Sequence, residues 1–223
     1  MTRAEIRALV RKGLGETTAS FWDDTELNTW IDDGGYDLSF RTKSIRSNGY
    51  ITTTSTVGEY TISTALAADV LTVLDVYYYV GGATWTKMAL MSREELDTRY
   101  PSWRSDTAGT PSIAYFDMEE DMIGFYVAPG EDQYGTSYAR VYYATKFTDL
   151  ALDTSVPTLP TYLHRAIVYY VIAYGYEQRG YGDKSNDAWT KYAAMITTYM
   201  GERTANKDQR EASETSTAKG VVK

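Results

Sequence analysis

The feature that most constrains the fold is a change in the spacing of apolar residues along the chain. The spacing is three and four residues from Thr25 to Arg46, close to two residues from Gly49 to Lys146, and three and four again from Thr161. The first and third patterns predict amphipathic helices, and the second predicts strands. The sequence therefore predicts an α+β protein, in which the N- and C-terminal helices form a small bundle and a β-rich insertion projects from it.

One long helix over residues 25–46 is the central element of the predicted bundle. Its apolar stripe is narrow and its opposite face is charged, so it needs packing partners to be stable. Asp24 or Thr25 is expected to cap its start. The other predicted helices span residues 2–12, 161–180 and 184–203. The residues expected in the bundle core are Leu27, Trp30, Ile31, Leu38, Leu163, Ile167, Tyr170 and Tyr192.

The paired glycines Gly34 and Gly35 interrupt the apolar stripe of this helix. Each costs about 1 kcal/mol of helix stability relative to alanine. Their presence is understandable where another backbone approaches the helix closely, and such an approach is expected here.

The middle of the chain predicts an insertion of short strands, of which Val70 to Val80 is the strongest because it is β-branched, leucine or aromatic almost throughout. After residue 203 the chain has no aromatic residue and almost nothing apolar, which predicts a disordered tail. The expected organisation is a helical bundle domain of residues 1–49 and 147–203, a β-rich insertion of residues 50–146, and a flexible tail of residues 204–223.

Composition limits the classes of function. The 223 residues include 21 tyrosines against 5 Phe and 5 Trp, which fits either half-exposed subunit contacts or simple strand propensity. The net charge of −8 disfavours tight binding to nucleic acid, although an acidic surface suits DNA that must slide past it. The absence of cysteine excludes disulfides and a cysteine nucleophile. No signal peptide and no membrane span of roughly 18 apolar residues is recognisable, so folding in a cytoplasm is expected.

No residue pattern indicates catalysis, a cofactor or a metal. His164 is the single histidine, so a usual zinc site is not expected, and no G-x-S-x-G motif accompanies it. The acidic pairs at 23–24 and 32–33 lack the spacing of a calcium loop. Tyr77 to Tyr79 resemble a stacking platform for single strands or sugars, but no Lys or Arg is interleaved with them.

The order of several short motifs carries more information than any of them alone. The first is W-x-D-x-E-L-x-x-W-I-x-x-G, formed by Trp22, Asp24, Glu26, Leu27, Trp30, Ile31 and Gly34. There follow G-x-Y-x-I (Gly58, Tyr60, Ile62), V-x-x-V-L-x-V (Val70, Val73, Leu74, Val76), P-S-W (Pro101, Ser102, Trp103), P-x-x-A-Y (Pro111, Tyr115), I-G-F-Y-V-A-P, V-Y-Y (Val141 to Tyr143) and L-P-x-Y-L-H-R-A-I-V-Y-Y (Leu159 to Tyr170). Over residues 3–203 this progression resembles the head-to-tail adaptor (connector) proteins of tailed bacteriophages.

The resemblance implies a structural virion protein without enzymatic activity or cofactor. Such adaptors form a homo-oligomeric ring, commonly a dodecamer, between the portal protein and a tail or tail-completion protein. The ring lies in the neck of the virion after assembly in the host cytoplasm, extends the DNA channel, and meets DNA only as passing cargo. The C-terminal segment of such adaptors often docks onto the portal. The positions that correspond here are Thr204, Arg210, Lys219, Val221, Val222 and Lys223.

Two alternatives remain at this stage. The chain fits another tail component, such as a tail-tube or tail-completion protein, in which the β-rich part mediates assembly. More distantly, the tyrosine-rich strands and His164 fit a carbohydrate-binding or hydrolytic module.

Overall fold

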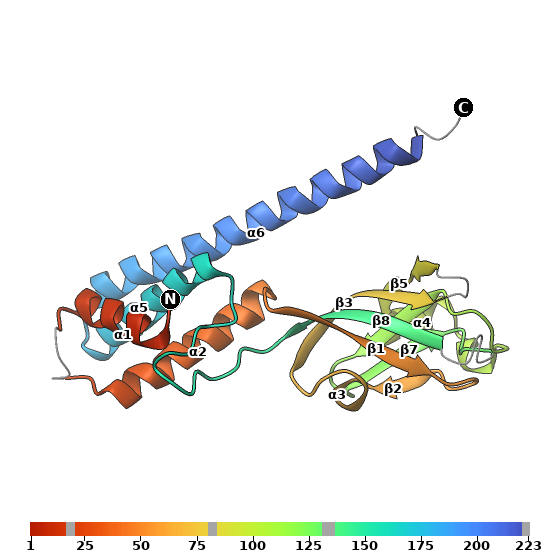
Figure 1. The fold of residues 1–223 in the computed structure, drawn as a ribbon, viewed down its shortest axis with the longest axis horizontal. Coiled ribbons are helices and arrows are strands. Elements are labelled where there is room, and N and C mark those ends of the chain that lie inside the picture. The colour runs from red at the N-terminus through yellow and green to blue at the C-terminus, as the bar shows by residue number, and fades with distance from the viewer. Residues whose placement is uncertain (17–20, 80–83, 131–136, 220–223) are drawn as a thin grey trace. The chain divides into compact units, whose positions relative to one another are not determined.

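The computed structural model describes residues 1–16, 21–79, 84–130 and 137–219. The chain divides into two compact units (Figure 1). Unit 1 comprises Met1–Ser44 and Phe147–Lys223, and unit 2 comprises Ile45–Lys146. Unit 1 is helical and unit 2 contains two β-sheets, so the predicted α+β class is confirmed. The first predicted boundary, between residues 49 and 50, lies a little later in the chain than the boundary between Ser44 and Ile45.

Unit 1 is built around helix α5 (His164–Gln178), which a 3-10 turn at Thr161–Leu163 precedes. It packs against the three other helices of the unit, α1 (Arg3–Leu14), α2 (Asp24–Thr42) and α6 (Gly182–Lys219). A central helix of this kind must be apolar on most of its circumference, and the α5 sequence HRAIVYYVIAYGYEQ meets that requirement.

The limits of α2 differ from the prediction at both ends. Its N-cap is Asp23, whose side chain accepts from the Glu26 N–H at 2.7 Å, instead of Asp24 or Thr25. The helix ends at Thr42, because Lys43 adopts a left-handed conformation with φ of 47° and its N–H bonds back to Ser39. Arg46, the predicted last residue of the helix, is instead the first residue of strand β1.

The glycines of α2 make room for aromatic rings. A Cβ atom at Gly34 would lie 3.0 Å from the ring of Tyr170, and one at Gly35 would lie 2.5 Å from the ring of Phe147. The close approach that the sequence indicates is therefore present, but side chains make it, not another backbone.

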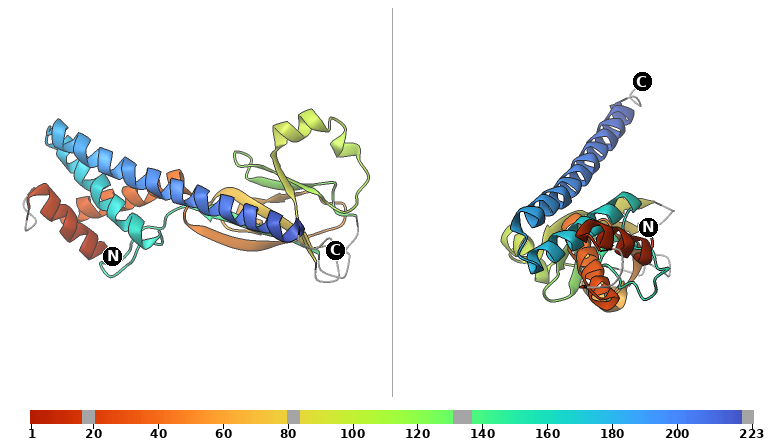
Figure 2. Two further views of the ribbon diagram at one scale, coloured as in Figure 1. Left: turned by 90° about the horizontal axis from the view of Figure 1, so that it is seen from above. Right: turned by 90° about the vertical axis from the view of Figure 1, so that its left-hand side faces the viewer.

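Helix α6 continues past the ends of α1 and α5 (Figure 2). Its backbone is helical to Lys219, which takes in residues 204–219 of the segment expected to form the tail. The shortage of apolar residues there excludes burial in a core, but Ala, Glu, Lys, Arg and Gln are all good helix formers. Residues 220–223 lie outside the described residues.

Unit 2 contains two four-stranded sheets, with strand orders β1-β8-β3-β4 and β2-β7-β6-β5. The strands are β1 (Arg46–Thr53), β2 (Glu59–Thr61), β3 (Val70–Tyr79), β4 (Trp85–Lys87), β5 (Ala89–Ser92), β6 (Ile113–Asp117), β7 (Met122–Tyr126) and β8 (Ser137–Thr145), with short helices α3 (Ile62–Ala65) and α4 (Arg93–Arg99) and a 3-10 turn at Trp103–Ser105. All strand pairs are antiparallel except the parallel pair β5–β6. The two sheets share a core that includes Val76, Val141 and Phe125.

Within the part of the chain that the structure describes, no helix combines the length and apolar character needed to cross a membrane.

Candidate functional site

The residues expected in the bundle core lie on the inner surfaces of unit 1. Those that are fully buried are Leu27, Ile31, Leu38, Leu163 and Ile167. Trp30 and Tyr192 are buried as well, at 8% and 4% exposure. Tyr170 is half-buried, and its ring meets the rings of Trp189 and Tyr192 edge-on at 5.2 and 5.5 Å between centroids. These residues join α2, α5 and α6.

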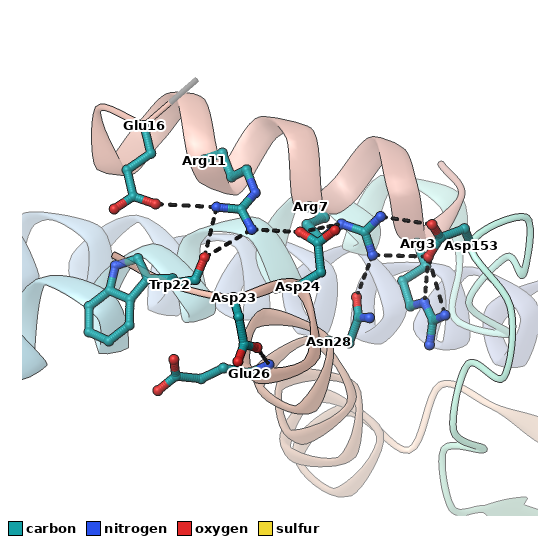
Figure 3. A network of polar contacts seen from close by, with 10 residues as sticks. All are labelled: Arg3, Arg7, Arg11, Glu16, Trp22, Asp23, Asp24, Glu26, Asn28 and Asp153. Carbon is teal, nitrogen blue, oxygen red and sulfur yellow. Dashed lines mark hydrogen bonds and ion pairs between the residues drawn. The ribbon is translucent and has the colours of Figure 1, made fainter. Parts of the chain in front are cut away.

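A row of three arginines on α1 ties this helix to the rest of the unit (Figure 3). Arg3, Arg7 and Arg11 are spaced four residues apart and therefore lie on one face of the helix. Arg7 donates to Asp153 at 2.8 Å and to Asn28 at 2.9 Å, and Arg3 also reaches Asp153. The hydrogen bond from Arg7 lowers the pKa of Asp153.

Arg11 forms the buried end of this row. It donates to Asp24 at 2.6 Å, to the carbonyl of Trp22 at 3.1 Å, and to Glu16 at 3.2 Å. Glu16 in turn accepts from Arg179 at 2.6 Å. Both arginines thus surround one buried carboxylate. This network was not predicted from the sequence, although the R-x3-R-x3-R spacing of the first helix places the three arginines on one face.

The acidic residues of α2 have separate roles. Asp23 caps the helix and Asp24 pairs with Arg7 and Arg11. Asp32 accepts from the Leu150 N–H at 3.1 Å, whereas Asp33 is exposed. These residues are not gathered at one point. Consistent with this, no group of three or more histidine or acidic residues could hold a metal ion in the described ranges.

Asp37 holds α6 against α2. It accepts hydrogen bonds from Arg41 at 2.7 Å and from the hydroxyl of Tyr192. Burial, followed by the bond to Asp37, raises the pKa of Tyr192 far above its usual value, so the hydroxyl stays protonated and able to donate. Further along α6, Arg203 donates to the carbonyl of Thr42 at 2.7 Å.

His164 is almost fully buried, at 1% exposure. Its Nε2 atom lies 2.9 Å from the carbonyl oxygen of Leu159, and its Nδ1 atom lies 2.9 Å from the nitrogen of Met1. An ammonium group can only donate, so Nδ1 accepts and Nε2–H donates to Leu159. Burial lowers the pKa of His164. His164 is therefore a buried residue whose two ring nitrogens both have partners.

The tyrosines of the strongest strand divide between the two faces of its sheet. Tyr78 is buried, whereas Tyr77 and Tyr79 are on the outer face. Neighbouring strands supply the cations that the sequence of β3 lacks. Lys87 lies 6.0 Å from the centroid of the Tyr77 ring, and Arg140 on β8 lies 4.9 Å from that of Tyr142. A mixed aromatic and charged surface of this kind is typical of protein contacts.

The positions expected to dock onto the portal lie on α6 or beyond it. Thr204 is exposed, and its hydroxyl donates to the carbonyl of Met200 at 3.0 Å. Arg210 and Lys219 are on the helical backbone of α6. Val221, Val222 and Lys223 lie outside the described residues.

Comparison with known families defines the class of the protein. The model of the family described as SU10 adaptor protein matches residues 1–220, nearly the whole chain. The chain therefore belongs to the SU10 adaptor protein family and is a structural adaptor of the bacteriophage type. The phage-adaptor level of the resemblance is confirmed by this match. A search of curated proteins found no match.

Proposed function

We propose that the protein forms the head-to-tail adaptor ring of a bacteriophage virion, between the portal and the tail. The observation that carries this proposal is the family match over residues 1–220. In this role the ring extends the DNA channel and provides a platform on which the tail assembles. Its partners are the portal protein, a tail or tail-completion protein, and further copies of the chain, which the resemblance puts at twelve.

The C-terminal part of α6 supports a docking role at the portal. Arg203 binds the carbonyl of Thr42, which fixes α6 to the bundle up to about that residue. Beyond it the helix continues to Lys219, past the other helices of unit 1 (Figure 1). A helix that projects from its own bundle is available to pack in a groove of another protein.

The charge of the chain supports a channel role. With 30 acidic and 22 basic residues, the protein repels DNA on average, so a ring of copies would let DNA pass without holding it.

Electron microscopy of the purified full-length protein, alone and mixed with the portal ring, tests the proposal. We expect a second ring stacked coaxially on the portal. Cross-linking in virions should also place the chain next to the portal. If the chain were cross-linked to tail-tube protein and never to the portal, the protein would be a tail component and the proposal would be wrong.

A further inference from the structure

Helix α2 carries an exposed stripe of Asp33, Tyr36 and Phe40. These residues are spaced three and four apart, so they lie on one face of the helix. Phe40 is 69% exposed and Tyr36 is 40% exposed. The Tyr36 hydroxyl donates to Asp149 at 2.8 Å, which holds its ring in place on the surface. Two large aromatic side chains side by side on a helix surface are typical of a contact with another protein.

A groove of about 630 Å³ lies elsewhere on unit 1, between α1, α5 and the first turns of α6. Its apolar lining includes Leu9, Val168, Ile172 and Ala188. Gly13 brings α1 close to this lining, since a Cβ atom there would lie 2.3 Å from Ile172. Clefts of this volume bury ligands about as large as two aromatic side chains.

The charged residues around the groove are mostly cationic. Four are basic and two are acidic: Lys12, Arg165, Lys184, Lys191, Asp183 and Asp187. Lys191 pairs with Asp187 at 2.6 Å. Lys184 lies 5.4 Å from the ring centroids of both Tyr176 and Tyr181, which keeps its ammonium group near the groove. The α2 stripe has the opposite charge, because Asp33 is exposed and Asp32 and Asp37 are its neighbours, with Arg41 paired to Asp37.

The α2 stripe and the groove are separate surfaces of the same unit. Helix α5 turns Tyr170 and Tyr174 toward Gly34 and Trp30 of α2. It contributes Val168 and Ile172 to the groove. The two surfaces therefore depend on different faces of α5, and a single copy presents both at once.

We infer that the α2 stripe of one copy docks into the α1/α5/α6 groove of the next copy. Phe40 and Tyr36 enter the apolar groove, and Asp33 faces the basic residues Arg165 and Lys184. The contact joins two different surfaces, so it leaves a free stripe at one end and a free groove at the other. Repetition of such a heterologous contact closes into a ring when the rotation between copies allows it. This inference rests on the proposed ring and specifies how its copies meet.

Engineered cysteines test this contact cleanly because the chain has none of its own. In the double variant Asp33→Cys with Lys184→Cys, mild oxidation should give a ladder of covalent oligomers on a non-reducing gel. Neither single variant should give more than traces of dimer. The matched control is Asp33→Cys with Asn186→Cys, since Asn186 is exposed on the same helix but does not line the groove. It should give no ladder.

Charge reversal provides a second test. Asp33→Lys should reduce the fraction of protein in rings at least several-fold, and adding Arg165→Glu should restore it. Unchanged thermal unfolding of each variant would show that the fold is intact. Rescue is expected only if the two residues face each other across a contact.

Three outcomes would overturn the inference. The first is rings that form without the ladder from cysteines at positions 33 and 184. The second is charge reversal without rescue. The third is a cysteine at Lys184 that pairs with a cysteine at Val221 instead, because the neighbour's C-terminal segment would then occupy the groove. If the portal carries no ring of this protein at all, the proposed function itself fails, which is a separate result.

Discussion

Two kinds of residue decide how the helices of unit 1 pack. Charged residues form ion pairs, and glycines leave room for aromatic rings. The carboxylate of Glu16 is buried between Arg11 and Arg179. A buried ion pair adds little net stability, but removal of one partner leaves a charge without compensation. Such residues therefore favour one arrangement of the helices over others, and they add little to the free energy of unfolding. The glycines of α2 have a complementary role, because they let aromatic rings approach the helix.

Gly35→Ala should destabilise the protein by about 1–3 kcal/mol, the usual cost of overpacking a well-packed interior. The added methyl group would lie 2.5 Å from the ring of Phe147, and that ring would have to move. Urea unfolding followed by circular dichroism measures the change.

Gly201→Ala is the matched control for this substitution. Gly201 also lies within a helix, but a Cβ atom there meets nothing within 4 Å. The change should be stabilising by about 0.5–1 kcal/mol, since alanine loses less freedom than glycine on helix formation. Equal effects at the two positions would contradict the packing described for α2.

The buried histidine predicts a pH dependence of stability. Burial lowers the pKa of His164 below its usual 6.5, so the unfolded chain binds more protons than the folded one between these two values. Its contribution is fully present above the unfolded pKa and is lost as the pH falls through the folded pKa. The midpoint of urea unfolding should therefore fall as the pH is lowered from 7 to 5.

His164→Gln removes the titrating group but keeps an N–H group for the carbonyl of Leu159. The variant should be less stable than the natural sequence at pH 7, and the difference should narrow toward pH 5. A difference that stays constant over this range would mean that the histidine does not titrate on unfolding.

At the scale of elements, local signals set the helix starts, and contacts with other segments set several of the ends. Thr2 and Glu5 form a capping box at the start of α1, and Ser92 caps α4 by accepting from the Glu95 N–H. The end of α2 is decided differently. Residues 46–53 pair antiparallel with β8, from Arg46 opposite Ala144 to Thr53 opposite Ser137, and Lys43 turns the chain out of the helix before them. Helix α6 is longer than its apolar pattern because helix propensity continues after the apolar residues stop.

Deletion of residues 204–223 should separate folding from docking. Arg203 and its bond to Thr42 remain, so the free energy of unfolding should change by no more than about 0.5 kcal/mol. Thermal unfolding measures this change. Co-sedimentation with portal rings should fall several-fold. If the shortened chain attaches to the portal as well as the full chain, the role proposed for the end of α6 is wrong.

At the scale of the whole molecule, net charge decides how the protein meets DNA. A net charge of −8 supplies no general attraction for phosphates. We expect no retention of duplex DNA in a gel-shift assay at protein concentrations up to about 10⁻⁴ M, where many non-specific DNA binders are already bound. Lower salt should not produce binding, because repulsion is then screened less. Binding that strengthens as salt is removed would contradict a channel that only lets DNA pass.

Much of the architecture was predictable because it depends on periodicity. The order of helices and strands, the division into a helical part and a β-rich part, and the buried positions Leu27, Ile31 and Ile167 all follow from apolar spacing. The candidate contact surfaces could not be predicted from apolar spacing. The groove joins Leu9, Ile172 and Lys184, which are far apart in the chain and share no motif.

The sequence by itself determined the class of fold and, through the order of its motifs, the family. Both depend on local patterns that each segment carries alone. Only the tertiary structure decided which charges pair, that His164 is buried, that Lys87 lies over the ring of Tyr77, and which apolar residues stay exposed on α2. These properties depend on which segments pack together. A contact between distant segments does not show in the apolar spacing of either segment.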